Sequence, residues 1–434
     1  LAVTGGGGLE AAREQRTAAI AAAEELGDAE LTARVIGAYD VPAIWTRSDD
    51  PRQAAEVVTA TERTLAALPG KGHDVLRARL LATVALESRG DRSGRGREAA
   101  LEAERIARGL DDPGLLAFVL NGVYMQTFQR AGLAPERDAI GAELVRLSRR
   151  HGLVTFEVLG HLVRVQARSA LGDFAGADHH ALAADELAAR HELPLVSVFT
   201  HWYHALRLTA SSAPTAREAP PNHPPASQPP AEKLQPGQPT AGQPTAGQPT
   251  AGRAEPGQAN AGQATPGQAN AGQQSARQAG AGQSRAGEGE DAYRGAVACL
   301  EGAGMPGLES GLPALARLCS RLRQGLSAQT EAGTDWGPYE PWTRPLVLVA
   351  RGRLAEAAAA LRRAPMPPHD LLFEAMWCLI ARTAMAVDDR EMMERARSEL
   401  GPAAGELAGA GSGLITLGPV AQYLDDLSDA LDRS

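Results

Sequence analysis

Residues 153–194, LVTFEVLGHLVRVQARSALGDFAGADHHALAADELAARHELP, carry the pattern that decides the fold. An apolar helix is followed by a short Gly/Asp turn, and an Ala-rich amphipathic helix then runs on to a closing proline. A helical hairpin of this kind cannot bury its own apolar face, so it must stack on neighbouring hairpins. The stretch therefore predicts an α-solenoid, a fold that binds and transmits and rarely catalyses.

The same plan occurs three times between Val75 and Pro194. The paired helices are expected at 75–89 and 93–109, 113–131 and 134–151, and 153–171 and 174–191. Their starts give a period of roughly 38–42 residues, longer than that of a strict tetratricopeptide. The third copy nevertheless has the small residue at the turn, the packing alanines and the closing proline of that repeat. We therefore expect an all-α, tetratricopeptide-like solenoid.

Further helices are expected on both sides of the repeats. In the first part of the chain they are 9–27, a helix with Asp28 as its N-cap that ends before Val41-Pro42, and 51–68 with Pro51 in its first turn. After the repeats they are 195–210, 291–304, 309–324, 341–351, 354–363, 369–387, 390–407 and 419–431. The polar stretch 335–345 (DWGPYEPWTRP) is expected as a loop.

A low-complexity segment separates helix 195–210 from its expected partner at 291. Gly-Gln or a variant of it recurs there every five residues, whereas collagen needs glycine at every third position. Such a composition buries almost no apolar surface and predicts disorder. The expected organisation is a disordered N-terminal remnant, the first part of the helical array, a disordered Gly/Pro/Gln/Ala-rich insert, and the second part with a C-terminal cap, at 1–8, 9–211, 212–290 and 291–434. Because the chain opens at Leu1, we also expect it to be a fragment of a longer protein.

Composition narrows the class of protein. The net charge is −9 and lysine occurs only at Lys71 and Lys233, which argues against a nucleic-acid surface. Cys299, Cys319 and Cys378 offer neither zinc spacing nor a disulfide framework. No apolar run has the length of a membrane span, and no signal peptide opens the chain. We expect a cytoplasmic protein that contacts neither nucleic acid nor membrane directly.

No catalytic or cofactor-binding residue is predicted. The glycine run 5–8 lacks the Lys-Ser/Thr pair of a phosphate loop, and Gly411-Ser412-Gly413 lacks the strand–turn–helix setting of a nucleophile elbow. The paired aspartates fall at predicted turns, where aspartate caps helices; they are Asp49-Asp50, Asp111-Asp112 and Asp388-Asp389.

Histidines form the one cluster that raises the question of a metal. His201 and His204 are one turn apart, and the preceding hairpin carries Asp178-His179-His180 and His191. A metal site would need further ligands at fixed spacing, and the sequence fixes none. We therefore predict packing or surface histidines and no metal.

Two predicted loops combine aromatic residues with arginine. Exposed aromatics flanked by arginine are the usual make-up of a binding hot spot. These residues are the predicted surface for a partner or a ligand, and they are Trp45, Arg47, Trp336, Tyr339, Trp342 and Arg344.

Three phrases together point to a family. They are RVIGAYDVPAIWTRSD (34–49), the stretch from FVLNGVYMQTF to RSALGD (118–173), and GPYEPWTRPLVLVARGR (337–353) with GELAGAGSGLITLGPVAQYL (405–424). They resemble the C-terminal helical region of large actinobacterial transcriptional regulators of the SARP type (Streptomyces antibiotic regulatory protein, AfsR-like). In that family a DNA-binding winged helix, a bacterial transcriptional activation domain and a nucleotide-binding switch ATPase precede a tetratricopeptide-like sensor region.

The resemblance implies that this chain is a sensor and protein-interaction region of a transcription regulator. DNA binding and ATP binding would then lie in missing N-terminal domains, since no Walker lysine or recognition helix is found here. The implied partners are a protein or peptide, including the regulator's own ATPase and DNA-binding domains, or a small-molecule effector. Two alternatives remain open: a scaffold that assembles proteins without a transcriptional role, and an enzyme, for which the histidine cluster is the sole support.

Overall fold

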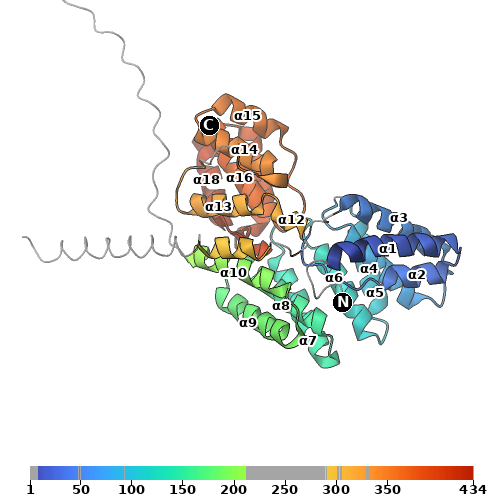
Figure 1. Cartoon of the computed structure of the whole chain (residues 1–434). Coiled ribbons are helices and arrows are strands. Elements are labelled where there is room, and N and C mark those ends of the chain that lie inside the picture. The colour runs from blue at the N-terminus through green and yellow to red at the C-terminus, as the bar shows by residue number, and fades with distance from the viewer. Residues whose placement is uncertain are drawn as a thin grey trace, which may run out of the picture. The chain divides into compact units, whose positions relative to one another are not determined.

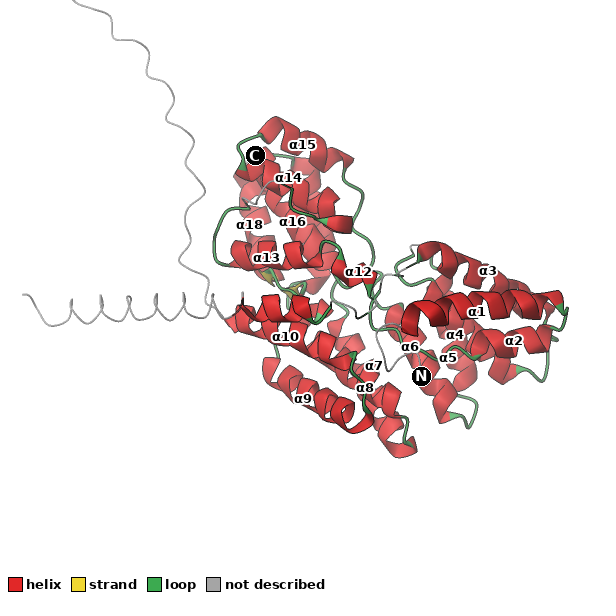
Figure 2. Ribbon diagram, viewed as in Figure 1, coloured by secondary structure: helices red, strands yellow, loops and turns green. Residues whose placement is uncertain are grey.

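The computed structural model describes residues 8–46, 48, 50–91, 93–211, 289, 291–300, 303, 305–328 and 333–433. Over these residues the fold is all-α with one short two-stranded sheet (Figure 2). They belong to a single compact unit. Among them, no helix is long and apolar enough to cross a bilayer. The expected remnant 1–8 and insert 212–290 lie outside the described residues, apart from Gly8 and Gly289.

The N-terminal part of the chain, residues 8–211, is a run of helices coloured blue to green in Figure 1. The helices are α1 (Gly8–Glu25), α2 (Ala29–Gly37), α3 (Pro51–Ala67), α4 (Asp74–Glu87), α5 (Arg95–Ala107), α6 (Pro113–Met125), α7 (Ala134–His151), α8 (Val154–Ala170), α9 (Phe174–His191) and α10 (Val196–Ser211). Two predicted starts are confirmed: Asp28 caps α2, and Pro51 begins α3. Helix α6 ends earlier than expected, at Met125.

Small residues decide how closely two of these helices approach. Helix α4 packs on α5 and α6, and α8 packs on both α7 and α9. At the crossing of α7 and α8, a Cβ atom on Gly160 would lie 2.9 Å from the backbone nitrogen of Val145. A Cβ atom on Gly141 would likewise lie 3.1 Å from the carbonyl oxygen of Gly160. The two glycines therefore let these backbones pack at a distance that larger residues would prevent.

The C-terminal part, residues 289–433, is also helical, and residues 291–298 form a helix there. Its further elements are α12 (Pro306–Glu309), α13 (Leu312–Arg323), η2 (Gly337–Tyr339), α14 (Glu340–Ala350), α15 (Leu354–Arg363), α16 (Phe373–Val387), α17 (Arg390–Leu400), η3 (Gly401–Ala403), β1 (Leu407–Ala408), η4 (Ala410–Ser412), β2 (Gly418–Pro419) and α18 (Val420–Arg433). Strands β1 and β2 are antiparallel, with Leu407 opposite Pro419. The ring of Trp202 in α10 contacts that of Tyr293, with centroids 5.7 Å apart, so the expected pairing across the insert is confirmed.

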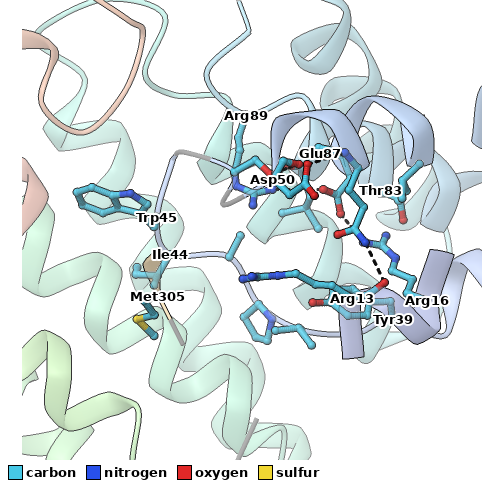
Figure 3. Close-up of a pocket in the computed structure, with 18 of the residues that line it drawn as sticks. Arg13, Arg16, Tyr39, Ile44, Trp45, Asp50, Thr83, Glu87, Arg89 and Met305 are labelled. Carbon is cyan, nitrogen blue, oxygen red and sulfur yellow. Dashed lines mark hydrogen bonds and ion pairs between the residues drawn. The ribbon is translucent and has the colours of Figure 1, made fainter. Parts of the chain in front are cut away.

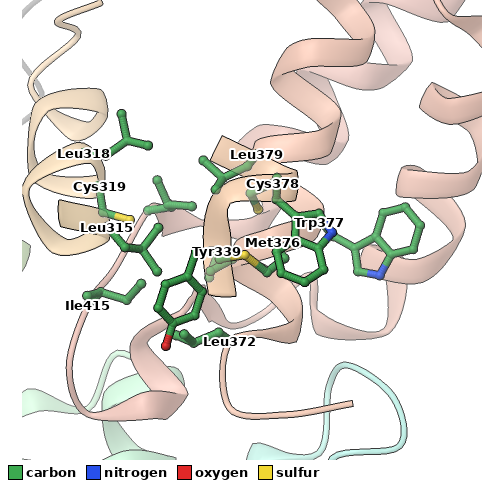
Figure 4. Packing of buried hydrophobic residues seen from close by; sticks show 14 of the residues in the cluster. Leu315, Leu318, Cys319, Tyr339, Leu372, Met376, Trp377, Cys378, Leu379 and Ile415 are labelled. Atoms are coloured by element: carbon green, nitrogen blue, oxygen red, sulfur yellow. The ribbon is translucent and has the colours of Figure 1, made fainter. Parts of the chain in front are cut away.

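The largest core cluster lies mainly in the C-terminal part (Figure 4). Helix α16 is buried on almost every side and places Met376, Trp377 and Cys378 there. Tyr339 from η2 and Ile415 from the segment before β2 pack into the same cluster. The three cysteines of the chain are free thiols, and burial raises the pKa of Cys319 and Cys378.

Two predictions about secondary structure are wrong. Residues 335–345 are not a loop, because η2 occupies Gly337–Tyr339 and α14 starts at Glu340, each with proline in its first turn, where a missing N–H costs nothing. The helix expected at 390–407 ends at Leu400, and the following Gly401-Pro402 begins η3. Residues 401–419 then leave the helical pattern and form the β1–β2 pair.

The segment 401–419 reaches back to the N-terminal part through Glu406. One Glu406 carboxylate oxygen accepts the backbone N–H of Ala134 at 3.0 Å, across 272 residues of sequence, at the first turn of α7. The other oxygen lies 3.8 Å from the guanidinium of Arg137, which also donates to the carbonyl oxygen of Thr127 at 3.1 Å. Glu406 and Arg137 are both buried. A carboxylate at a helix N-terminus is favourable, so this contact fixes the segment against α7.

A glycine in the turn before α7 is expected to be essential for that contact. Gly132 has φ +81°, and a Cβ atom there would lie 2.2 Å from the carbonyl oxygen of Pro402. Gly132→Ala should lower the free energy of unfolding by about 3 kcal/mol, because both backbone strain and a clash result. Gly152→Ala is the matched control, since φ is +67° with nothing within 4 Å, and it should cost about 1 kcal/mol. Urea unfolding of both variants measures this, and equal losses would contradict the close approach of Pro402.

Candidate functional site

The segment between α2 and α3, residues 38–50, is held in place by side chains of two helices. The guanidinium of Arg79 in α4 lies 3.2 Å from the carboxylate of Asp40. The side-chain amide of Asn121 in α6 accepts the N–H of Ala43 at 2.8 Å and donates to the Ala43 carbonyl oxygen at 2.7 Å. The buried Asn121 thus forms the hydrogen bonds with the Ala43 backbone that a neighbouring strand would form in a sheet. The segment is an ordered part of the fold over its described residues.

This segment closes a cavity of about 150 Å³ (Figure 3). Helices α1, α3, α4 and α6 of the N-terminal part contribute to its wall. Phe199 of α10 also lines it, as do Met305 and Leu308, from the start of the C-terminal part. The cavity therefore joins residues from both sides of 212–288.

One end of the cavity is charged. Glu87 at the end of α4 is shared by two arginines, with Arg16 at 2.6 Å and Arg89 at 3.5 Å. The guanidinium of Arg16 also lies 4.1 Å from the ring centroid of Tyr39. Burial raises the pKa of Tyr39, while Arg16, Arg13 and Arg89 act in the opposite direction. All three arginines are therefore close enough to lower the pKa of the same side chain, Tyr39.

Hydrogen-bond donors at this site outnumber their acceptors. The side chain of Arg16 is 10% exposed and that of Arg89 is 15% exposed. In each of them the Nε atom is buried and has no hydrogen-bond partner among the residues that the structure describes. The indole nitrogen of Trp45 is buried and unpaired in the same way. Buried donors without acceptors are costly, so an acceptor placed beside these nitrogens would be stabilising.

The other end of the cavity is apolar. Ile44 and Trp45 of the 38–50 segment lie there beside Met305 in Figure 3, away from Arg16 and Tyr39. Phe118 and Phe199 add two aromatic rings to the lining. A ligand that fits this cavity would have a polar head and an apolar body.

Trp45 is thus the one predicted surface residue that lines this cavity, among those that the structure describes. It is half-buried and packs on two core clusters, so it faces inward more than the prediction assumed. Arg47 lies outside the described residues. Trp336 and Arg344 line a different, open cavity with Arg351 and Arg353, so the structure does not bring the two predicted loops together at one cavity.

The prediction that Tyr339 and Trp342 form an exposed loop is wrong. Tyr339 is fully buried in the core of Figure 4. Trp342 is 5% exposed, and its indole N–H donates to the carbonyl oxygen of Pro365 at 2.9 Å. Both are buried because they lie in η2 and α14, and α14 packs on α15 and α16. Arg344 is exposed and pairs with Glu340 at 3.3 Å.

Two histidines of the third hairpin form a buried pair that the sequence did not reveal. Nδ1 of His161 in α8 lies 2.9 Å from Nδ1 of His180 in α9. One ring must therefore accept a hydrogen bond on an unprotonated nitrogen. Burial lowers the pKa of His161 to about 4, and Arg149 adds to this while Glu157 opposes it. Burial likewise lowers the pKa of His180 to about 3, with Arg164 as the next cause.

The predicted histidine cluster is dispersed. The ring of His179 contacts that of His180, whereas the exposed His201 bonds through Nδ1 to the carbonyl oxygen of Ser197. Across the described ranges, no group of three or more His, Cys, Asp or Glu residues is placed to hold a metal ion. The histidine pair is best explained by packing of α8 on α9.

Comparisons with known proteins give no relative for this chain: no family model matches it, and neither curated proteins nor solved structures produced a match. The site must therefore be interpreted from its own geometry.

Sequence reasoning missed the charged end of the cavity. Arg16, Glu87 and Arg89 come from two helices and a loop, and each lies in an ordinary amphipathic context. No spacing along the chain links Arg16 to Glu87, which are 71 residues apart. The one feature of the sequence that pointed to this site was the aromatic residue Trp45 in a predicted loop.

The buried histidine pair predicts a specific acid sensitivity. Unfolded histidines bind a proton near pH 6.5, whereas the folded pair stays neutral until about pH 4. The stabilising contribution is therefore complete above pH 6.5 and is lost as the pH falls from there towards 4. The double variant His161→Gln/His180→Gln should lose clearly less stability than the wild type between pH 7.5 and 5, by roughly 30-fold in the unfolding equilibrium constant for each histidine.

Urea unfolding at the two pH values measures that difference. The exposed His201 provides the control, since His201→Gln should retain the wild-type pH dependence. The same pH dependence in all three proteins would contradict a buried neutral pair.

Proposed function

We propose that this chain is the sensing and partner-binding region of a transcription regulator, built as a tetratricopeptide-like helical array. The phrases at 34–49, 118–173, 337–353 and 405–424, which resemble SARP-type regulators, support the regulatory role. In the structure these stretches of sequence form the segment that closes the cavity, helices α6 to α8, helix α14 and part of the 401–419 segment.

The packing of α4 on α6 supports the repeat architecture. Helix α4 contacts both its own partner α5 and the first helix of the next pair, α6. Such contacts between equivalent helices of neighbouring hairpins are what a stacked array requires. The C-terminal part differs from an open array of stacked hairpins, because Glu406 and its segment contact α7. We propose an array closed on itself by this return, in place of an open solenoid.

The cavity is the observation that carries the sensing role. Its wall includes Arg16 of α1, Phe199 of α10 and Met305 ahead of α12. A bound molecule would contact all three, and would stabilise the arrangement in which they are close. A ligand shifts an equilibrium between two conformations only by the difference between its affinities for them. If the N-terminal and C-terminal parts separate, the cavity is lost, so the ligand would bind only the docked conformation.

The acting end of the regulator is proposed to lie outside these residues. The net charge of −9 disfavours duplex binding by this chain, and the sequence has no phosphate-loop lysine. DNA and ATP binding are therefore assigned to other domains of the same regulator. Those domains are the proposed protein partners, and the proposed location is the cytoplasm.

A cavity-filling variant tests the proposed function. Met305 is half-buried at the apolar end, so Met305→Trp should fill the cavity and alter the transcript levels of a discrete set of genes when introduced into the chromosomal copy. Leu354→Trp is the matched control, because Leu354 is 48% exposed and lies outside the cavity. Total RNA sequencing of both strains measures the effect, with circular dichroism of the purified variants as the check on folding.

Transcript levels that are unchanged by a folded Met305→Trp protein would contradict a role in transcription. Equal changes in both strains would contradict the assignment of sensing to the cavity.

A further inference from the structure

The size of the cavity limits its occupant to a small molecule. A dry engineered cavity of about 150 Å³ is known to hold a benzene ring. The cavity beside Trp45 has about the same volume. The whole cavity therefore has room for about one six-membered ring with a small substituent.

The charges that line the cavity select an anion. Arg16 and Arg89 share the single carboxylate of Glu87, and the side chains of all three residues are largely buried. Asp50 also lines the cavity, and one of its oxygens accepts the Gln53 N–H at 2.9 Å as the N-cap of α3. Around Glu87, two guanidinium groups thus compete for one carboxylate. A guanidinium remains protonated at any physiological pH, so this competition cannot be relieved by loss of a proton.

The unpaired donors point to the same chemistry. At the charged end, Nε of Arg16 and Nε of Arg89 are buried without acceptors in the described structure. A cationic ligand would bring more donors and more positive charge, whereas a carboxylate brings two acceptor oxygens and one negative charge. Arginine binds a planar carboxylate through two parallel hydrogen bonds, which adds geometric selectivity.

The polar and apolar ends are arranged in a fixed order. Arg16 lies on α1 beside Tyr39, and Ile44, Trp45 and Met305 lie at the opposite end in Figure 3. A ligand with its anionic head at one end and its ring at the other would satisfy both ends at once.

We propose that this cavity binds a monocyclic aromatic carboxylate, with the carboxylate against Arg13, Arg16 and Arg89 and the ring between Ile44, Trp45 and Met305. The role of this ligand as an effector rests on the proposed function, whereas its binding to the cavity does not. The ligand lies across the junction of the N-terminal and C-terminal parts, and its binding holds residues 41–45 against the cavity.

Calorimetric titration of the full chain with sodium phenylacetate tests the proposal. The roughly ten non-hydrogen atoms of this probe give an expected Kd on the order of 10⁻⁴ M. Phenylacetamide has the same shape without the charge and should bind at least about tenfold more weakly, since an ionised acceptor forms the stronger hydrogen bonds. 2-Phenylethylamine carries the opposite charge and should not bind. Equal affinity for the acid and the amide would overturn the assignment of an anion, and absence of phenylacetate binding would overturn the proposal.

Two variants locate the binding. Met305→Trp should abolish phenylacetate binding, while Leu354→Trp should leave it unchanged. Arg16→Gln leaves Glu87 paired with Arg89, so the buried carboxylate is not left alone, and it should weaken binding about tenfold. Unchanged affinity in both Met305→Trp and Arg16→Gln would place the ligand elsewhere and overturn the proposal.

Tryptophan fluorescence gives a second readout at the same site. Trp45 is the tryptophan that lines the cavity among the five in the chain. Phenylacetate should change the emission of the wild type, and Trp45→Phe should remove that change. An unchanged response in Trp45→Phe would contradict the proposed place of the ring. Because these measurements need no promoter, they fail or succeed independently of the transcript test of Met305→Trp.

Discussion

The carboxylate of Glu406 is the constraint on which the rest of the fold depends. It closes the N-terminus of α7 and lies beside the buried guanidinium of Arg137, which would otherwise be a charge without compensation. Loss of one partner from such a pair is far more costly than the pair is stabilising. The same arginine opposes the effect of burial on Glu374, which raises the pKa of that carboxyl to about 7. Residues 401–419 are therefore held against α7 by charge as well as by shape.

This constraint reaches the cavity through the 38–50 segment. That segment is held on one side by Asn121 of α6, and on the other by the C-terminal part, where the N–H of Leu371 donates to the hydroxyl of Thr46 at 3.0 Å. The walls of the cavity are thus complete only when both parts of the chain are docked. A molecule that binds there acts on the docking equilibrium, and this is a physical basis for sensing that needs no moving catalytic group.

Local features of the fold could be predicted from the sequence, because caps and hairpins depend on neighbouring residues. Asp50, Asp112 and Asp389 cap helices as expected, through the N–H groups of Gln53, Leu115 and Met392. Tyr339 and Trp342 were misplaced because the polar stretch 335–345 was expected as a loop, whereas its prolines lie in the first turns of η2 and α14. The cavity had no local signal beyond Trp45, since its charges meet only in three dimensions. The contact between Glu406 and α7 could not be predicted from helical periodicity either, because it joins residues 272 positions apart.

Native-state hydrogen exchange in increasing urea tests most directly whether the two parts of the chain form one cooperative structure. If Glu406 and its segment join them as described, the slowest amides of α7 and α8 and those of α16 should approach the same opening free energy and the same urea dependence. If stacking of neighbouring helices alone stabilises the fold, α16 should open at lower urea while exchange in α7 and α8 remains unchanged. That second result would contradict the account.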